Sequence, residues 1–281
     1  MKKIIAVWDH SNTSSKLLKK ANTIAQDLGA NVILAVFVTS LNQKKYEAKH
    51  NATLIKKIED QVAENFDSSV NVKHIIAVDQ DIAKWVNGFC EKTKVDLILK
   101  TGNRSETLFH TPVDWQLIRQ VSSPVLIASA KQWKKKPKIL ATIDVDNTSN
   151  KQKTINTKVL SAAKFVADMT GSHLHVIYNI AITKALTELD IVEPSEIISK
   201  KGKEAKKLLD SCLEKNKIED ATTHVVAGDV AVTVPRIAKK IKADLVVMGS
   251  VGRTGMKGML LGNTAEKVLH NLRTDILVIK P

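Results

Sequence analysis

The chain has 281 residues, 43% hydrophobic and 26% charged, so it is long enough to form two domains with complete cores. No apolar run approaches the roughly 20 residues that cross a bilayer, and Met1-Lys2-Lys3 leads into an expected strand, not a secretory signal. We therefore expect a cytoplasmic protein without a membrane partner. The net charge is +14, but only five of the 43 basic residues are arginines and few aromatic residues lie among the lysines, which argues against nucleic-acid binding.

The first half of the sequence alternates short apolar runs with amphipathic segments. In chain order, the expected strands are 4–9, 32–38, 73–79, 95–99 and 124–127, and an expected helix over 17–28 is closed by Gly29. A long, charged and less regular stretch follows the second strand. Strands alternating with helices are typical of βαβ units, so this half predicts a parallel sheet covered on both faces.

The second half repeats this pattern strand for strand. Its expected strands are 139–144, 174–178, 223–229, 243–247 and 275–278, and an expected helix over 159–170 is closed by Gly171. The fold class is therefore α/β with two tandem domains. We place the first domain at residues 1–130, a lysine-rich solvated linker at 131–137, and the second domain at 138–281.

A glycine-rich loop follows the fourth strand of the second half. Met248 ends the apolar run, and Gly249, Gly252 and Gly262 punctuate the connection to an amphipathic helix. Such a loop directs backbone N–H groups at an anion above the sheet, and Arg253 adds positive charge near a phosphate. Alternatively, the glycines only permit a tight connection.

These glycines, the following Asn-Thr-Ala-Glu at 263–266 and the final run at 276–281 resemble the universal stress protein family. The resemblance implies two flavodoxin-like or Rossmann-like domains, each a five-stranded parallel sheet of order 3-2-1-4-5, with a nucleotide crevice between strands one and four. Thr-Pro-Val-Asp-Trp at 111–115 resembles the tandem E group of the family. The family also implies a homodimer, or pairing of the fifth strands 125–127 and 276–279 within one chain as a pseudo-dimer.

The resemblance assigns roles to residues at the strand ends. Asp144 would hold the ribose or adenine side of a ligand, or would instead cap the following turn. Gly228 and Asp229 would line the base pocket, or would form a plain strand-to-helix turn. Asn263 stands where nucleotide-binding members have serine or threonine, with Thr264 one residue later. The expected ligand-binding set is Asp144, Gly228, Asp229, Met248, Gly249, Gly252, Arg253, Gly262, Asn263 and Thr264.

The first half keeps the strand-end aspartate as Asp9 but lacks the glycines. Thr101, Arg104 and Thr111 take their places, so we expect no nucleotide in this half. The apolar stretch 180–194 of the second half lines an extended ligand, covers a domain interface or is an ordinary covering segment.

The sequence contains no set of nucleophile, base and orienting residue, so we expect no catalytic residue and no enzyme. Cys90 and Cys212 are expected to be free thiols, and no metal site is expected because His173, His175 and His224 lack partners at metal spacing. We expect a stress-response binding protein for ATP or another nucleotide conjugate, without a certain cofactor. A ligand-free interaction scaffold and a weak ATP hydrolase are the alternatives.

Overall fold

The computed structural model describes residues 2–9, 15–38, 48–78, 80–102, 113–182, 192–250 and 263–281, and excludes the side chains of 48–51 and 263–266. These residues divide into two compact units, Met1–Gln132 and Trp133–Pro281. Within the described ranges, every helix is too short or too polar to cross a bilayer. The expected cytoplasmic location and the expected strand pairing between the two halves stay predictions.

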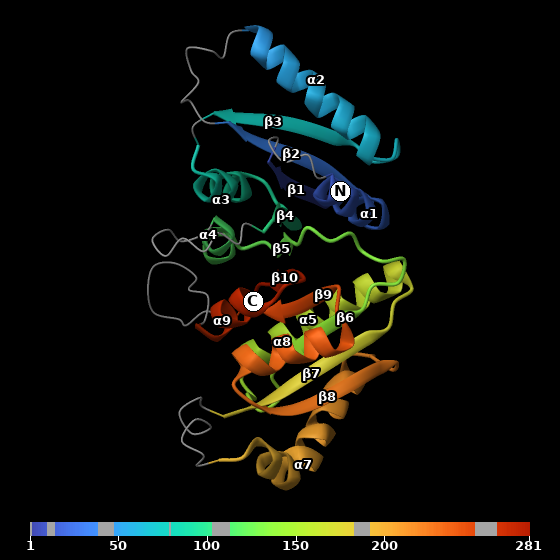
Figure 1. Cartoon of the computed structure of the whole chain (residues 1–281), viewed down its shortest axis with the longest axis vertical. Coiled ribbons are helices and arrows are strands. Elements are labelled where there is room, and N and C mark those ends of the chain that lie inside the picture. Colours follow the sequence, from blue (N-terminus) through green and yellow to red (C-terminus); the bar gives the residue numbers. More distant parts are fainter. Residues whose placement is uncertain are drawn as a thin grey trace. The chain divides into compact units, whose positions relative to one another are not determined.

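The first unit is a five-stranded parallel sheet between two helical layers (Figure 1). The strand order is β3-β2-β1-β4-β5, and α1 contacts α2 while α3 contacts α4. Right-handed crossovers require this division of the helices where the strand order reverses. The elements are β1 (Lys2–Trp8), α1 (Lys16–Leu28), β2 (Ala30–Val38), α2 (Ala48–Asn65), β3 (Val72–Val78), α3 (Ile82–Lys92), β4 (Leu97–Thr101), α4 (Val113–Gln120) and β5 (Val125–Ala128).

The second unit repeats the topology, with strand order β8-β7-β6-β9-β10. In Figure 1, α8 and α9 lie in front of this sheet and α5 lies behind it. The elements are β6 (Ile139–Ile143), α5 (Asn150–Thr170), β7 (Leu174–Ala181), α7 (Pro194–Lys215), β8 (Ala221–Gly228), α8 (Val230–Ile241), β9 (Leu245–Gly249), α9 (Asn263–Asn271) and β10 (Asp275–Ile279). The predicted fold, two parallel sheets each of order 3-2-1-4-5, is confirmed.

The two units share helix-ending glycines and aspartate side-chain hydrogen bonds at equivalent positions. Gly29 and Gly171 end α1 and α5 in left-handed conformations, with φ of 58° and 57°. Asp96 accepts a hydrogen bond from Lys3 N (2.9 Å), and Asp244 accepts the equivalent bond from Lys138 N (3.0 Å). These aspartates, each one residue before β4 or β9, therefore accept a hydrogen bond from the backbone at the start of the first strand of their unit.

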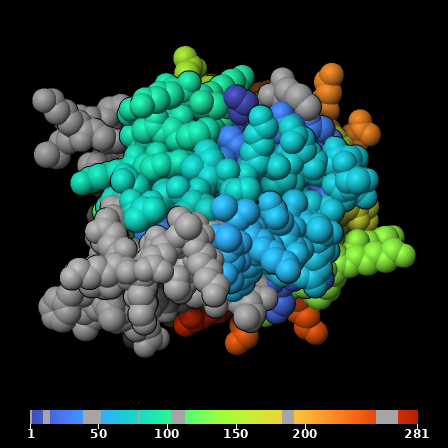
Figure 2. Space-filling view, turned by 90° about the horizontal axis from the view of Figure 1, so that it is seen from above, coloured from blue at the N-terminus to red at the C-terminus, as the bar shows by residue number. Residues whose placement is uncertain are grey.

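Several helices are longer than the sequence pattern predicted. The stretches described as less regular contain α2, with 18 residues, and α7, with 22. Helix α5 begins at Asn150, nine residues before the expected start at 159. Ser149 explains this early start, because its hydroxyl accepts a hydrogen bond from Gln152 N (3.2 Å) as an N-cap. Seen from above, α2 and the segment from β3 to α3 form the outer surface of the first unit (Figure 2).

The lysine-rich segment 131–137 was predicted to be a solvated tether, and this is only partly right. Lys134, Lys135 and Lys136 are exposed, but Trp133 Nε1 donates a 2.7 Å hydrogen bond to Asp275 Oδ2. Lys134 Nζ also lies 3.1 Å from Asp244 Oδ1. The segment is thus fastened to the second unit at the amino ends of β9 and β10.

Candidate functional site

The candidate site lies where the strand order of the second unit reverses. Strand β6 pairs on one side with β7 and on the other with β9, with Thr142 opposite Met248. Asp144 follows β6 by one residue and Gly249 ends β9, so both lie at adjacent carboxyl ends of the sheet. Ligands of doubly wound α/β sheets bind in the crevice outside such a reversal.

Asp144 caps the turn that follows β6. Its Oδ1 accepts hydrogen bonds from Asp146 N (3.2 Å) and Asn147 N (3.3 Å). Oδ2 accepts neither of these bonds, and the residue is half-buried. The capping role weighed for Asp144 is present, and a second carboxylate oxygen remains outside the turn.

The side chain of Asn156 on α5 forms hydrogen bonds with the backbone of Asp144, and the sequence analysis did not identify this role. The buried Asn156 amide donates to Asp144 O (2.6 Å) and accepts from Asp144 N (3.2 Å). Gln152, one turn earlier, donates a 2.9 Å bond to Asn156 Oδ1. The sequence signal that could have indicated this support is a pair of amide side chains at an i, i+4 spacing, Gln152 and Asn156.

Tyr178 on β7 lies beside the same turn. Its side chain is buried at 2% exposure, and burial together with the hydrogen bond and negative charge of Asp146 raises its pKa above the ordinary value. The phenol therefore stays protonated and can donate to the Asp146 carboxylate. Tyr178 and Asn156 together fix the β6–α5 turn from two neighbouring elements.

Gly249 is required by packing. A β-carbon at this position falls 2.6 Å from Ile155 Cγ1 and 3.6 Å from Val159 Cγ2, both on α5. The next backbone N–H, that of Ser250, donates to Ile279 O (2.9 Å) within the sheet. The Ser250 N–H is therefore not available to an anion, and any phosphate-binding N–H group must come from later in the loop.

Gly228 and Asp229 form the strand-to-helix turn that was weighed against a base pocket. Gly228 has φ +136°, which favours glycine, and Asp229 caps α8 by accepting from Ala231 N (2.9 Å). The Gly228 carbonyl already accepts from Asn179 Nδ2 (2.9 Å) and Ile182 N (3.2 Å). Thr233 closes this network by donating to Asn179 Oδ1 (2.7 Å).

The remaining predicted site residues fall largely beyond the description. Gly252, Arg253 and Gly262 lie outside the described residues, and so do the side chains of Asn263 and Thr264. Helix α9 begins at Asn263. Met248 is described and is buried at 5% exposure. Only 180–182 and 192–194 of the apolar stretch are described.

The first unit carries a buried ion pair at the matching position. Val7 pairs with Lys100 as Thr142 pairs with Met248, so Lys100 corresponds to Met248 and Thr101 to Gly249. Lys100 Nζ lies 2.8 Å from Asp114 Oδ1 on α4, and the two side chains are 7% and 9% exposed. Charged side chains thus occupy the strand end that is apolar in the second unit.

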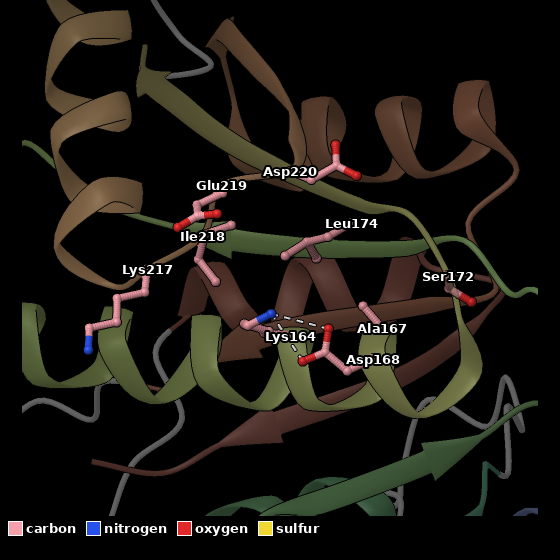
Figure 3. A pocket seen from close by; sticks show the side chains of 9 residues that line it. All are labelled: Lys164, Ala167, Asp168, Ser172, Leu174, Lys217, Ile218, Glu219 and Asp220. Atoms are coloured by element: carbon pink, nitrogen blue, oxygen red, sulfur yellow. Dashed lines mark hydrogen bonds and ion pairs between the residues drawn. The ribbon is translucent and has the colours of Figure 1, made fainter.

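A solvent-facing cavity of about 420 Å³ lies elsewhere in the second unit, at the amino ends of β7 and β8. In Figure 3, Lys164 and Asp168 of α5 face each other across one wall, with Nζ and Oδ2 3.0 Å apart. Lys217, Glu219 and Asp220 stand on the opposite side, in the turn before β8. The two lysines and three carboxylates give the cavity charges of both signs. It is separate from the switch point.

The described part of the chain contains two free cysteines, as expected, and a cluster of histidines with a lowered pKa at its centre. Cys90 and Cys212 are free, and burial raises the pKa of both thiols. Burial and the neighbouring His224, His173 and Lys138 lower the pKa of His175 to about 4. Within the described ranges, no three His, Cys, Asp or Glu side chains are placed to share a metal ion.

The fold defines a class of protein, a tandem pair of doubly wound α/β domains. The model of the universal stress protein family matches residues 1–129 and 138–280. Because the match spans nearly the whole chain, the protein belongs to the universal stress protein family.

Some relatives match the whole chain and others match part of it. The universal stress protein E homolog of Haemophilus influenzae is 26% identical over 301 residues, covering 100% of this chain and 97% of the relative. Universal stress protein E of Escherichia coli K12 is 32% identical over 192 residues, covering 66% of this chain and 61% of its own. A crystal structure of a universal stress protein from Pseudomonas aeruginosa UCBPP-PA14 aligns with a TM-score of 0.78 at 27% identity, covering 100% and 94%. The predicted resemblance to the E group is confirmed.

Proposed function

We propose that the second unit binds a nucleotide or a nucleotide-conjugated metabolite, and that the protein acts in a stress response in the cytoplasm. The observation that carries this proposal is the register of β6 against β9. This register brings Asp144 and the start of the glycine loop to adjacent strand ends at the reversal of strand order. Two features more than 100 residues apart in the sequence therefore lie at adjacent strand ends, where we propose that the ligand binds.

The roles of the groups in this crevice differ. Asp144 Oδ1 is engaged in the turn, so Oδ2 is the acceptor for a ribose hydroxyl. The glycine loop would contact phosphates through backbone beyond Ser250, because the Ser250 N–H is bonded within the sheet. The Gly228 carbonyl already accepts two hydrogen bonds, so it is a poor acceptor for a base. We infer that ribose and phosphate contacts dominate recognition.

We propose binding without catalysis for this protein. The described residues around the switch point include carboxylates and amides, but no nucleophile with a hydrogen-bonded base beside it. A weak ATP hydrolase remains the enzymatic alternative. It would be supported by phosphate release that is abolished by the same substitution that abolishes nucleotide binding.

A ligand-free scaffold is the second candidate, and one observation favours it. Gly249, Asp144 and Asp229 each have a complete structural role without a ligand: in packing, turn capping and helix capping respectively. A fold can keep these residues after losing its ligand. The scaffold therefore predicts an empty crevice in the protein as isolated.

Mass spectrometry of small molecules released from gently purified protein tests the proposal. We expect a nucleotide or nucleotide conjugate in the wild type and its loss in Gly252→Arg, which places in the loop the side chain that the first half carries as Arg104. Nothing bound in either protein, together with no heat of binding on titration with ATP, would overturn the nucleotide proposal and favour the scaffold.

A matched pair of variants assigns the site to one unit. Asp144→Asn keeps the Oδ1 acceptor that caps the turn but removes the carboxylate charge. We expect it to weaken nucleotide binding about tenfold or more, the effect of losing a charge-assisted hydrogen bond. Asp9→Asn makes the same change at the equivalent strand end of the first unit and should leave binding unchanged. Equal effects of the two substitutions would contradict the assignment.

A further inference from the structure

Two imidazoles of neighbouring strands face each other in the second unit, away from the switch point. His175 on β7 pairs with Thr222 on β8, and His224 lies two residues beyond Thr222. Residues paired across parallel strands share a face and side chains alternate with period two, so His175, Thr222 and His224 project from the same face of the sheet. His175 is opposite Leu140, four residues or about 13 Å along β6 from Asp144.

The two ring nitrogens are separated by a distance that suits a shared cation. His175 Nδ1 lies 3.2 Å from His224 Nε2. A tetrahedral Zn²⁺ holds each imidazole nitrogen at about 2.0–2.1 Å, which places two such nitrogens about 3.3 Å apart. Both side chains are carried by hydrogen-bonded strands of one sheet, so rotation of the two imidazoles is enough to direct these nitrogens at one ion. Without a cation, the same nitrogens share one hydrogen bond.

An ion can reach the two imidazoles from solvent, and nearby positive charges limit how tightly it binds. Both rings are half-buried, and the His173 side chain beside them is 43% exposed. The rings of His173 and His175 have centroids 5.2 Å apart, and His173 Nε2 contacts Thr222 Oγ1 (2.8 Å). Lys138 and Lys240 add positive charge near His175 and His224 respectively. These lysines oppose hard cations bound by charge alone, and favour ions held by nitrogen donors.

We propose that His175 and His224 bind a late first-row divalent transition metal, of which Zn²⁺, Ni²⁺ and Cu²⁺ are the members that prefer imidazole. Water completes the coordination, because within the described residues no third ligand is placed to share the ion. The hydrogen that one ring donates in the metal-free state moves through solvent to the far nitrogen of that ring. Both facing nitrogens are then lone-pair donors, and no net proton is released.

Titration calorimetry of the untagged full chain with Zn²⁺ tests the proposal. We expect one ion per chain, with Mg²⁺ producing no binding heat. His175→Gln and His224→Gln should each weaken Zn²⁺ binding by about a hundredfold, since even outer-shell substitutions cost 10–100-fold. His74→Gln is the matched control, because His74 is an exposed histidine on β3 and should not affect binding. Unchanged Zn²⁺ binding in both site variants, or none in the wild type, would overturn the proposal.

Electron paramagnetic resonance of the wild-type protein loaded with one equivalent of Cu²⁺ tests the site without any substitution. Two equatorial nitrogens in the hyperfine pattern support the proposal. One nitrogen or none contradicts it, even if a variant has failed to fold. The crevice at Asp144 plays no part in either measurement, so the two proposals stand or fall separately.

Discussion

Ile155 of α5 fills the space that a side chain at Gly249 would need. A β-carbon on Gly249 falls 2.6 Å from Ile155 Cγ1, whereas non-bonded carbon atoms prefer about 3.5–4.0 Å. Ile155 is 1% exposed, so it has little room to withdraw. The first glycine of the loop is therefore needed for helix-on-sheet packing, whether or not a nucleotide binds.

Gly249→Ala should lower the free energy of unfolding of the second unit by about 1–3 kcal/mol, the usual cost of overpacking a core. Urea denaturation followed by circular dichroism measures it. The double variant Gly249→Ala/Ile155→Ala should lose less stability than the sum of its single variants, because Ile155→Ala removes Cγ1 from the clash. Gly88→Ala on α3, where a β-carbon meets nothing within 4 Å, should be neutral or slightly stabilising. Strict additivity in the double variant would contradict the packing role.

The buried pair Lys100–Asp114 predicts asymmetric costs of substitution in the first unit. Lys100→Met introduces the residue type of the equivalent position in the second unit and removes the cation that lies 2.8 Å from Asp114 Oδ1. We expect a loss of about 3–5 kcal/mol, the usual cost of breaking a buried ion pair by removing one of its members. Lys100→Met/Asp114→Leu should recover part of that loss. Thermal unfolding measures both, and a single variant within 1 kcal/mol of wild type would show that the pair is dispensable.

The fold was predictable because its signals are local and repeated. The apolar runs that became β1 and β6, and the glycines Gly29 and Gly171 that end the next helices, recur in both halves of the sequence. Boundaries were less accurate where a side chain and not hydrophobicity sets the limit. The side chain of Ser149 caps α5, so that this helix begins nine residues before its apolar pattern.

The site was only partly predictable, because its decisive contacts are tertiary. The sequence placed Asp144 and Gly249 at strand ends, and the turn-capping role weighed for Asp144 is present in the structure. The sequence did not indicate that Gly249 packs against α5. Ile155 and Gly249 are 94 positions apart in the sequence, and no local sequence pattern predicts their contact. The same holds for His175 and His224, whose spacing along the chain is unlike a metal motif but whose strands are neighbours.

Burial of the two thiols predicts slow alkylation. The raised pKa values of Cys90 and Cys212 mean that less thiolate is present at any given pH than for an ordinary cysteine, so reactivity should rise only at higher pH. We expect iodoacetamide to react with the folded protein at pH 8 about tenfold more slowly than with the urea-unfolded protein. Cys90→Ser and Cys212→Ser separate the two rates by mass spectrometry. Reaction at the speed of free cysteine at pH 8 would exclude buried thiols.

Trp133 attaches the segment after Gln132 to the second unit, so its substitution should lower the stability of that unit. Trp133→Phe keeps an aromatic side chain, although a smaller one, and removes the indole N–H that donates a 2.7 Å hydrogen bond to Asp275, a residue only 1% exposed. Losing a hydrogen bond to a buried charged group costs about 1.5–3 kcal/mol, so the urea midpoint of the second unit should fall. Lys134→Ala, in the same segment, removes an ion pair whose lysine is 59% exposed and should cost less than about 1 kcal/mol. If the two substitutions cost the same, Trp133 does not anchor the segment through Asp275, and the solvated tether expected from the sequence is the better description.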